Sequence, residues 1–320
     1  SLHYPLPISQ LKYILAIDVH RHFAKAADAS GVTQPTLSIQ VQKLEDALGV
    51  KIFDRSRSPV IPTEAGKEIL EQAKKILLEK SRIAEIISRR KGLLEGELRI
   101  GIIPTLAPYL LPLFVQSFTR RYPGVKLVVF EKTTNILMQL LRDSILDVGI
   151  LVTPLNEKGI REEVLFYEEL LAYVSENSGL YQKTYVLAKD IDPNKLWLLE
   201  EGHCFRSQMI NLCELFKATR LGSHFDYEAG SFETLRRMVE MNDGITVLPE
   251  LATLDFGKRQ RGLIRHFRKP APMREVSLVV TRDFVKERLV GILKNEILAC
   301  IPDKIKRNKD THVVPLETDF

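Results

Sequence analysis

FAKAADASGVTQPTLSIQVQKLEDAL, residues 23–48, predicts two short helices joined by a turn. The first of these helices, from Phe23 to Ala29, is rich in alanine, which lets another helix approach closely. Gly31 supplies the backbone freedom of a tight turn. Thr33 can cap the second helix, and Pro35 is tolerated in its first turn. Two helices joined in this way form a helix-turn-helix unit.

The second helix has two distinct faces, and a third helix (Gln10 to Val19) precedes the pair. Apolar residues at helical spacing form the predicted buried face: Leu37, Val41, Leu44 and Leu48. Short hydroxyls, amides and a lysine can reach base edges and phosphates in a DNA major groove. The predicted DNA-contacting residues of this helix, with the proline of its first turn, are Thr33, Gln34, Pro35, Thr36, Ser38, Gln40 and Lys43.

Lys51 to Thr63 resembles a two-stranded wing whose tip carries Arg55 and Arg57. These two cations are expected to contact backbone phosphate or a minor groove. Residues 1–91 contain 15 Lys and Arg against 10 Asp and Glu, whereas the remainder is balanced at 31 of each. The excess positive charge therefore lies beside the predicted DNA-binding face. The alternative is a small helical protein-binding domain with a solvated polar face.

Thr63 to Lys91 predicts one long helix with a heptad seam. Its apolar positions are Ile69, Ala73, Ile76, Ile83 and Ile87, and Lys80 fills the missing one. Such a seam is typical of a dimerising coiled coil, and two-fold proteins contact two DNA half-sites. The alternative is a helix packed only on its own chain.

Strands alternate with helices from Glu97 onward, which predicts an α/β region with parallel-type sheets. The predicted strands are residues 98–103, 125–130, 148–151, 170–174, 196–199, 244–248 and 276–280. The predicted helices are residues 108–121, 136–143, 206–217, 232–241 and 284–299. Thr105 and Thr134 follow the first two strands, so their hydroxyls are expected at a ligand cleft, although threonines there often only cap helices.

No phosphate-binding loop, dinucleotide fingerprint, nucleophile elbow or zinc-protease motif occurs in the sequence. An enzyme would have to use Cys204 and His203 as a nucleophile–base pair, and adjacent residues rarely reach that geometry. We therefore expect a protein that is not an enzyme and uses no cofactor. No run of 18 apolar residues and no signal segment occurs, which favours a cytoplasmic protein without membrane contact.

Of the three cysteines, Cys204 lies just before the helix predicted at 206–217, and Cys213 lies on its apolar face. On a helix their Cα atoms would be roughly 13 Å apart, whereas a disulfide needs about 4.4–6.8 Å. A bond between them would therefore unwind the helix. His203, Arg206 and a helix N-terminus favour a reactive thiolate at Cys204. Alternatively, Cys213 is a small core residue and Cys204 an incidental thiol; a zinc site with His203 and His224 lacks the usual ligand spacing.

Several motifs resemble those of a known family. These are Phe23-Ala-Lys-Ala-Ala-Asp28, Thr33-Gln-Pro-Thr-Leu-Ser38, Gln42-Lys-Leu-Glu-Asp-Ala-Leu-Gly49, Phe53-Asp-Arg55 and Thr63-Glu-Ala-Gly66. They are similar to the winged helix-turn-helix of LysR-type transcriptional regulators. Further motifs resemble the peroxide-sensing subfamily: residues 101–112, Glu201-Gly-His-Cys204, the spacing to Cys213, residues 233–238 and residues 244–249.

The resemblance implies an all-α winged helix-turn-helix, a long linker helix and a two-lobed α/β regulatory region like periplasmic binding proteins. The chain would cross between the lobes near Tyr167 and Ala271. The expected divisions are residues 8–65 (DNA-binding domain), 66–92 (dimerisation helix), 96–167 and 272–302 (lobe I), 168–271 (lobe II with the redox switch) and 303–320 (tail).

The resemblance also implies roles for individual residues. Cys204 would be the peroxidatic thiol and Cys213 the resolving thiol of a reversible disulfide. The residues matching the peroxide pocket are Thr105, Thr134, His203, Arg206 and Arg274. Ser207 stands where an acidic residue is common, and His224 does not cleanly match a pocket histidine of the subfamily.

Implied partners are promoter DNA, further copies of the chain in a dimer or tetramer, hydrogen peroxide, RNA polymerase and a thiol reductant. No metal is expected. A LysR-type regulator that binds a small-molecule effector between its lobes is the alternative with the same fold.

Overall fold

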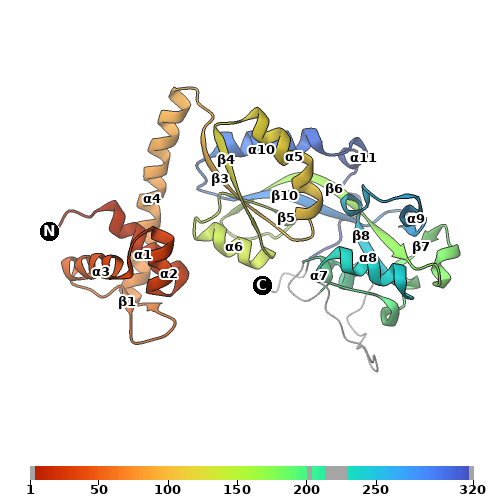
Figure 1. Cartoon of the computed structure of the whole chain (residues 1–320), viewed down its shortest axis with the longest axis horizontal. Helices are drawn as coiled ribbons and strands as arrows, with labels where there is room; N and C mark the ends of the chain where they lie inside the picture. Colours follow the sequence, from red (N-terminus) through yellow and green to blue (C-terminus); the bar gives the residue numbers. More distant parts are fainter. Residues whose placement is uncertain (1–3, 200–203, 213–229, 317–320) are drawn as a thin grey trace. The chain divides into compact units, whose positions relative to one another are not determined.

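The computed structural model describes residues 4–199, 204–212 and 230–316. The chain divides into two compact units, Ser1–Leu93 and Leu94–Phe320 (Figure 1). No helix in the described ranges is long and apolar enough to cross a membrane.

The first unit is a winged helix-turn-helix followed by a long helix, as predicted. Its elements are α1 (Ile8–His20), α2 (Phe23–Ser30), α3 (Gln34–Leu48), β1 (Phe53–Asp54), β2 (Ile61–Pro62) and α4 (Glu64–Arg90). Gly31 ends α2 with a φ of 69°, in the left-handed region that favours glycine. Ile14, Leu37 and Leu44 are fully buried and join α1 to α3.

The wing lies against the start of α4, and Gly66 permits this approach. A Cβ at Gly66 would stand 2.0 Å from the carbonyl oxygen of Ile52. Thr63 caps α4 by accepting a hydrogen bond from the Gly66 N–H at 2.9 Å. The wing and the long helix are therefore joined at one short segment.

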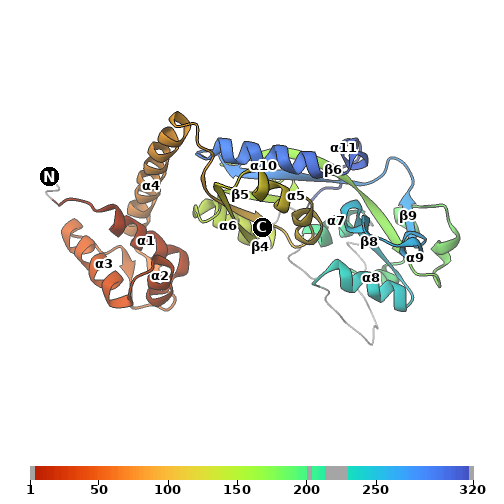
Figure 2. The same ribbon diagram turned by 45° about the horizontal axis from the view of Figure 1, so that its top comes forward.

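The second unit is a mixed sheet with helices packed against it (Figures 1 and 2). Its strands are β3 (Gly96–Ile102), β4 (Val125–Glu131), β5 (Val148–Thr153), β6 (Ile160–Val174), β7 (Tyr185–Val186), β8 (Ile245–Pro249), β9 (Ile264–Phe267) and β10 (Met273–Thr281). Its α-helices are α5 (Ala107–Arg121), α6 (Thr134–Arg142), α7 (Cys204–Leu212), α8 (Phe232–Met241), α9 (Lys258–Arg261), α10 (Glu287–Cys300) and α11 (Asp303–Lys306).

The prediction of parallel-type sheets holds for only part of the sheet, which is mixed. The strand order is β4-β3-β5-β10-β6-β9-β7, with β8 paired to β6. β3 pairs in parallel with β4 and β5, but β10 is antiparallel to both β5 and β6. The long strand β6 explains the difference, because it runs through both halves of the unit. Its first part pairs with β10 and its last residues, Leu170–Val174, pair with β8.

The second unit contains two separate hydrophobic cores, which confirms the two-lobed prediction. Lobe I has the larger core, in which α5 and α10 pack together; it contains Phe114 and Leu293. Lobe II has the smaller core, which contains Tyr173, Phe205 and Phe232. Both β6 and the start of β10 connect the lobes. The two-lobed architecture with an N-terminal helix-turn-helix is thus present as predicted.

Three local predictions need correction. Residues 196–199 form isolated bridges, among them Leu196 with Ile245, rather than a strand. The strand predicted at 170–174 is only the end of β6, which starts at Ile160. The prediction missed the first part of this strand because its charged residues give no apolar pattern. α7 begins at Cys204, two residues before the predicted start, and the predicted helical residues 213–217 lie outside the described part.

The segment 312–316 is ordered against both lobes. Met273 N donates to His312 O at 2.8 Å, and Val314 N donates to Met273 O at 2.9 Å. The Val314 side chain is buried in the core of lobe II and the Leu316 side chain in that of lobe I. Gln208 and Asn211 of α7 donate to the carbonyl oxygens of Val314 and Pro315 at 3.0 and 2.9 Å. This segment therefore ties α7 to the lobe connection.

Candidate DNA interface and regulatory pocket

The predicted DNA-contacting face of α3 presents polar side chains to solvent, from the N-cap Thr33 onward. Thr33, Gln34, Pro35, Thr36 and Lys43 are exposed, and Ser38 is half-buried. The hydroxyls of Thr33 and Thr36 lie 2.8 Å apart and share one hydrogen bond. The exposed N-terminal residues of a recognition helix are those that reach base edges in a major groove.

Gln40, placed by the sequence on the same face, is partly turned inward. Its Oε1 accepts a hydrogen bond from Nε2 of Gln10 at 3.1 Å, which joins α3 to α1. Gln10 is buried and also donates to the Tyr4 hydroxyl. Gln40 thus holds the recognition helix on its support in this structure.

Both wing arginines are paired, Arg55 with a carboxylate of α3 and Arg57 with a carboxylate of the wing itself. Arg55 lies 3.2 Å from the Glu45 carboxylate and 4.7 Å from the Phe23 ring centre. Arg57 lies 3.4 Å from the Asp54 carboxylate and keeps 68% of its side chain exposed. Hydrogen bonds from Ser56, together with the charge of Arg57, lower the pKa of Asp54. Arg57 is therefore the more available of the two cations for phosphate.

Glu45 is the central polar contact between α3 and the wing. The sequence analysis did not predict this role. Its carboxylate is buried and accepts hydrogen bonds from the N–H groups of Ile52 and Phe53 at 2.9 and 3.3 Å. Lys51 and Arg55 supply two cations at 3.3 and 3.2 Å. Glu45 thus bonds the recognition helix directly to the backbone at the base of the wing.

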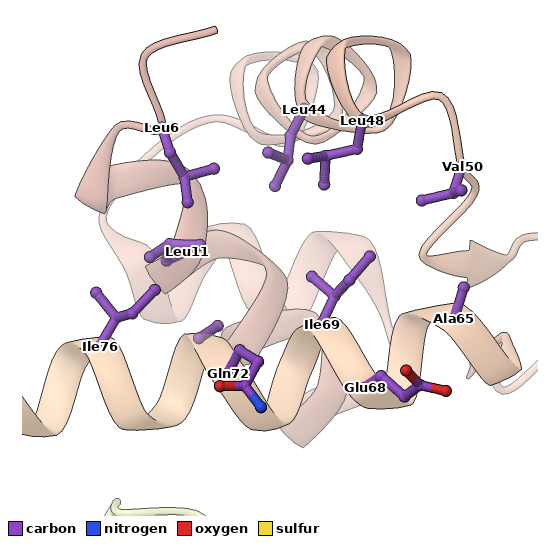
Figure 3. Close-up of a pocket in the computed structure, with 11 residues that line it drawn as sticks. Leu6, Leu11, Leu44, Leu48, Val50, Ala65, Glu68, Ile69, Gln72 and Ile76 are labelled. Atoms are coloured by element: carbon purple, nitrogen blue, oxygen red, sulfur yellow. The ribbon is translucent and has the colours of Figure 1, made fainter. Parts of the chain in front are cut away.

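An apolar groove of about 490 Å³ lies between α1, α3 and α4 (Figure 3). It is lined by Leu6, Leu11, Leu44, Leu48, Val50, Ala65, Glu68, Ile69, Gln72, Ala73 and Ile76. Along the same long helix, Ile83 and Ile87 are 61% and 49% exposed. Of the predicted heptad positions, Ile76, Ile83 and Ile87 remain exposed in the single chain, whereas Ala73 is buried and Ile69 partly buried against the core of this unit.

Arg274 is the centre of a buried polar cluster in the second unit. Its guanidinium has no exposed surface and donates from Nε to Glu168 at 2.5 Å. Its Nη1 donates to Thr105 Oγ1 at 3.0 Å, and its Nη2 donates to Thr105 O at 3.2 Å. The guanidinium carbon also lies 5.6 Å from the ring centre of Phe205, the residue after Cys204 in α7.

The strand register explains why Thr105 and Thr134 lie at one edge of the sheet. β3 and β4 are parallel neighbours with Ile102 opposite Glu131, so the segments that follow them start at the same edge. Both threonines are buried, and Thr134 is the first residue of α6. The sequence-based placement of these hydroxyls at the strand ends agrees with this geometry.

Of the remaining predicted site residues, Cys204 and Arg206 lie in the first turn of α7. Cys204 is the first residue of that helix, whose N-terminus favours negative charge. Arg206 donates from Nη1 to the Leu199 carbonyl at 2.7 Å, so its guanidinium is engaged by the backbone. His203 and Cys213 lie outside the described residues, as does His224 of the zinc alternative. No group of three or more potential metal ligands occurs in the described part of the chain.

Aromatic side chains connect the two lobes beside this cluster. Tyr109 of α5 lies 6.3 Å from Phe232 of α8, and Phe232 lies 4.7 Å from Phe205. Burial and the charge of Glu233 raise the pKa of Tyr109 to about 12, so its hydroxyl stays protonated. The start of α7 is thus packed against both the buried cation and the lobe contact.

The pattern described as the bacterial regulatory helix-turn-helix protein, LysR family, matches residues 8–67, and that of the LysR substrate binding domain matches residues 91–295. A relative named "DNA-binding transcriptional dual regulator OxyR" from Escherichia coli K12 is 37% identical over 274 residues, 85% of this chain and 88% of its own. The chain is a LysR-type transcriptional regulator of the OxyR subfamily.

Other OxyR-type proteins show the same relation. A "Hydrogen peroxide-inducible genes activator" from Haemophilus influenzae is 35% identical over 85% of this chain and 89% of its own. The solved structure of a full-length OxyR variant from Pseudomonas aeruginosa is 33% identical, covers 95% of this chain and all of its own, and has a TM-score of 0.76. Membership of this DNA-binding family confirms the expectation of a regulator that is not an enzyme.

Proposed function

We propose that this LysR-type regulator senses hydrogen peroxide through a reversible Cys204–Cys213 disulfide and controls transcription at promoter DNA. The observation that carries the proposal is the buried Arg274–Thr105 pair packed on Phe205 at the start of α7. A buried cation and a fixed hydroxyl beside a helix N-terminus suit a thiolate and the oxygens of a peroxide. Relatives named for peroxide induction support the choice of oxidant.

The proposed chemistry has two steps. The Cys204 thiolate attacks one oxygen of HOOH; an S–O bond forms, the O–O bond breaks, and hydroxide leaves and takes a proton to become water. The thiolate is thereby oxidised to a sulfenic acid. Cys213 then attacks that sulfur, which forms the S–S bond and releases water. Thr105, Thr134, His203 and Arg274 would hold the peroxide and the leaving oxygen, and Arg206 is assigned to the same pocket.

The resting helix supports a switch rather than a preformed bond. Eight helical steps from Cys204 to Leu212 span about 12 Å, and a disulfide requires about 4.4–6.8 Å between Cα atoms. Bond formation would therefore unwind α7, which contacts Phe232, Arg274 and the segment 312–316. A thiol reductant would reverse it.

The first unit would deliver the output at double-stranded promoter DNA. Its predicted contacts are the exposed residues of α3 with Ser38 and Gln40, and the wing residues Arg55 and Arg57. A second copy of the chain would cover Ile76, Ile83 and Ile87 of α4, with assembly to a tetramer and contact with RNA polymerase. These partners imply a cytoplasmic location at the nucleoid. We keep the domain divisions given by the sequence as part of this proposal.

The deciding experiment is thiol mass analysis of the full chain in a Cys300→Ser background. After sub-stoichiometric hydrogen peroxide and alkylation, we expect a linked Cys204–Cys213 peptide, and none in Cys204→Ser or Cys213→Ser. A chain that keeps both thiols while a small molecule changes its DNA binding would instead be an effector-binding regulator of the same family.

A further inference from the structure

Glu168 is the buried carboxylate that completes the Arg274 cluster, and no motif in the sequence includes it. Neither Glu168 nor Arg274 has exposed side-chain surface. Glu168 Oε1 accepts from Arg274 Nε, and its Oε2 accepts from the N–H of Leu251 at 3.0 Å. A buried charge without such a partner is strongly destabilising, so the two residues require each other.

These contacts fix the guanidinium in space. Three of its five N–H donors are assigned, one to Glu168 and two to Thr105. Because the fork is planar, these bonds set both its position and its rotation. Glu168 approaches at the Nε end and Thr105 at the opposite end, so the carboxylate holds the guanidinium against the Thr105 hydroxyl.

The arrangement also determines which way the Thr105 hydroxyl donates. Oγ1 of Thr105 accepts from an arginine, which has no lone pair to receive a proton. The hydroxyl hydrogen must therefore point away from Arg274, toward another acceptor. At the strand edge shared with Thr134, that acceptor would be an oxygen of the bound peroxide.

We propose that Glu168 is a positioning residue for the peroxide reaction: it holds Arg274 so that Thr105 is a fixed hydrogen-bond donor to the peroxide. This inference rests on the proposed function. Glu168 itself touches no peroxide and transfers no proton. Its removal should slow oxidation of Cys204 without slowing reactions of the thiol that do not use the peroxide pocket.

The test compares Glu168→Gln with Glu169→Gln in the Cys300→Ser background. Glu169 is the next residue of β6 and pairs with His266 instead of Arg274. We expect Glu168→Gln to lower the rate of Cys204 oxidation by hydrogen peroxide about tenfold, as loss of a charged hydrogen bond implies. Alkylation of Cys204 by iodoacetamide should change less than about twofold, and Glu169→Gln should leave both rates unaltered.

A double-mutant cycle shows whether Glu168 acts through Arg274. In an Arg274→Gln background, Glu168→Gln should cause no further loss of oxidation rate, because the group it positions is gone. An equal loss in both backgrounds, or an equal fall of both reactions in Glu168→Gln, would overturn the inference. If Glu168→Gln alone does not fold, Glu168→Asp takes its place in the cycle: it keeps the buried charge but draws the carboxylate back from Arg274, so it should slow oxidation of Cys204 on its own and cause no further loss beside Arg274→Gln.

The two proposals fail in different ways. If peroxide does not oxidise Cys204 in the unaltered chain, the proposed function is wrong. If it does, and Glu168→Gln reacts at the same rate, only the role of Glu168 is wrong.

Discussion

One pair of residues, His266 and Glu169, forms an ion pair that should make the free energy of unfolding depend on pH. His266 Nδ1 lies 2.8 Å from Glu169 Oε1, between β9 and β6. The hydrogen bond to Glu169 raises the pKa of His266, with Glu250 acting in the same direction and both burial and Lys304 opposing it. The pair therefore stabilises the fold while the histidine is protonated.

We predict that this contribution is complete below the ordinary histidine pKa of about 6.5 and is lost as pH rises through the higher pKa of the folded state. The free energy of unfolding should then fall more between about pH 6 and pH 8 in the unaltered chain than in His266→Gln. Urea denaturation at both pH values measures this change in the free energy of unfolding, which gives the slope of stability against pH. His20→Gln, an exposed change in the other unit, should not alter the slope; a slope unchanged in His266→Gln would contradict the prediction.

At the scale of elements, α7 is held by a segment far away in sequence. The Gln208 side chain is fully buried and bonded to Val314, and Asn211 bonds to Pro315. We predict that truncation before Asp310 speeds amide hydrogen exchange in α7 at least about tenfold, because local opening no longer breaks these contacts. Hydrogen-exchange mass spectrometry of the reduced chain measures this.

A shorter truncation provides the matched control. Removal of residues 317–320 leaves the bonds to Val314 and Pro315 in place, so α7 should exchange as in the unaltered chain. Equal exchange in both truncated chains would show that the segment does not hold the helix.

Elements with local signals could be predicted, whereas pairings between distant residues could not. α2, α3, α5 and α8 were found within one or two residues of their ends, because alanine content, caps and apolar spacing are local properties. The start of β6 was missed because its Arg161, Glu162 and Glu163 give no apolar pattern. The antiparallel place of β10 depends on partners more than 100 residues away.

The same limit applies to the candidate sites. Its position after a strand pointed to Thr105, resemblance to a family supplied Arg274, and the structure joins the two in one cluster. Glu45 and Glu168 were not predicted, since a glutamate in a helix or strand is usually solvated. Their importance comes only from burial and from partners that the fold brings to them.

For the whole molecule, the exposed isoleucines of α4 predict how copies associate. Ile83 is 61% exposed in the single chain and continues the seam that begins at the groove of Figure 3. We expect Ile83→Lys to weaken dimerisation at least about tenfold, because each copy loses a large apolar side chain from the interface and gains a charge there. Sedimentation over a concentration series measures the dimer fraction.

Glu85→Lys introduces the same side chain at a partly exposed position outside the seam. It should dimerise like the unaltered chain. Dimerisation weakened equally by both changes would point to charge rather than to the apolar seam.

The contacts between α7 and the segment 312–316 suggest an assay of the redox state that requires no DNA. Lys309 is exposed and lies just before the segment 312–316. Unfolding of α7 would break its hydrogen bonds to the segment 312–316, and trypsin would then cleave after Lys309 more quickly. The rate of cleavage at Lys309 would thus report oxidation of the purified protein without DNA, and it would separate peroxide sensing from the control of transcription.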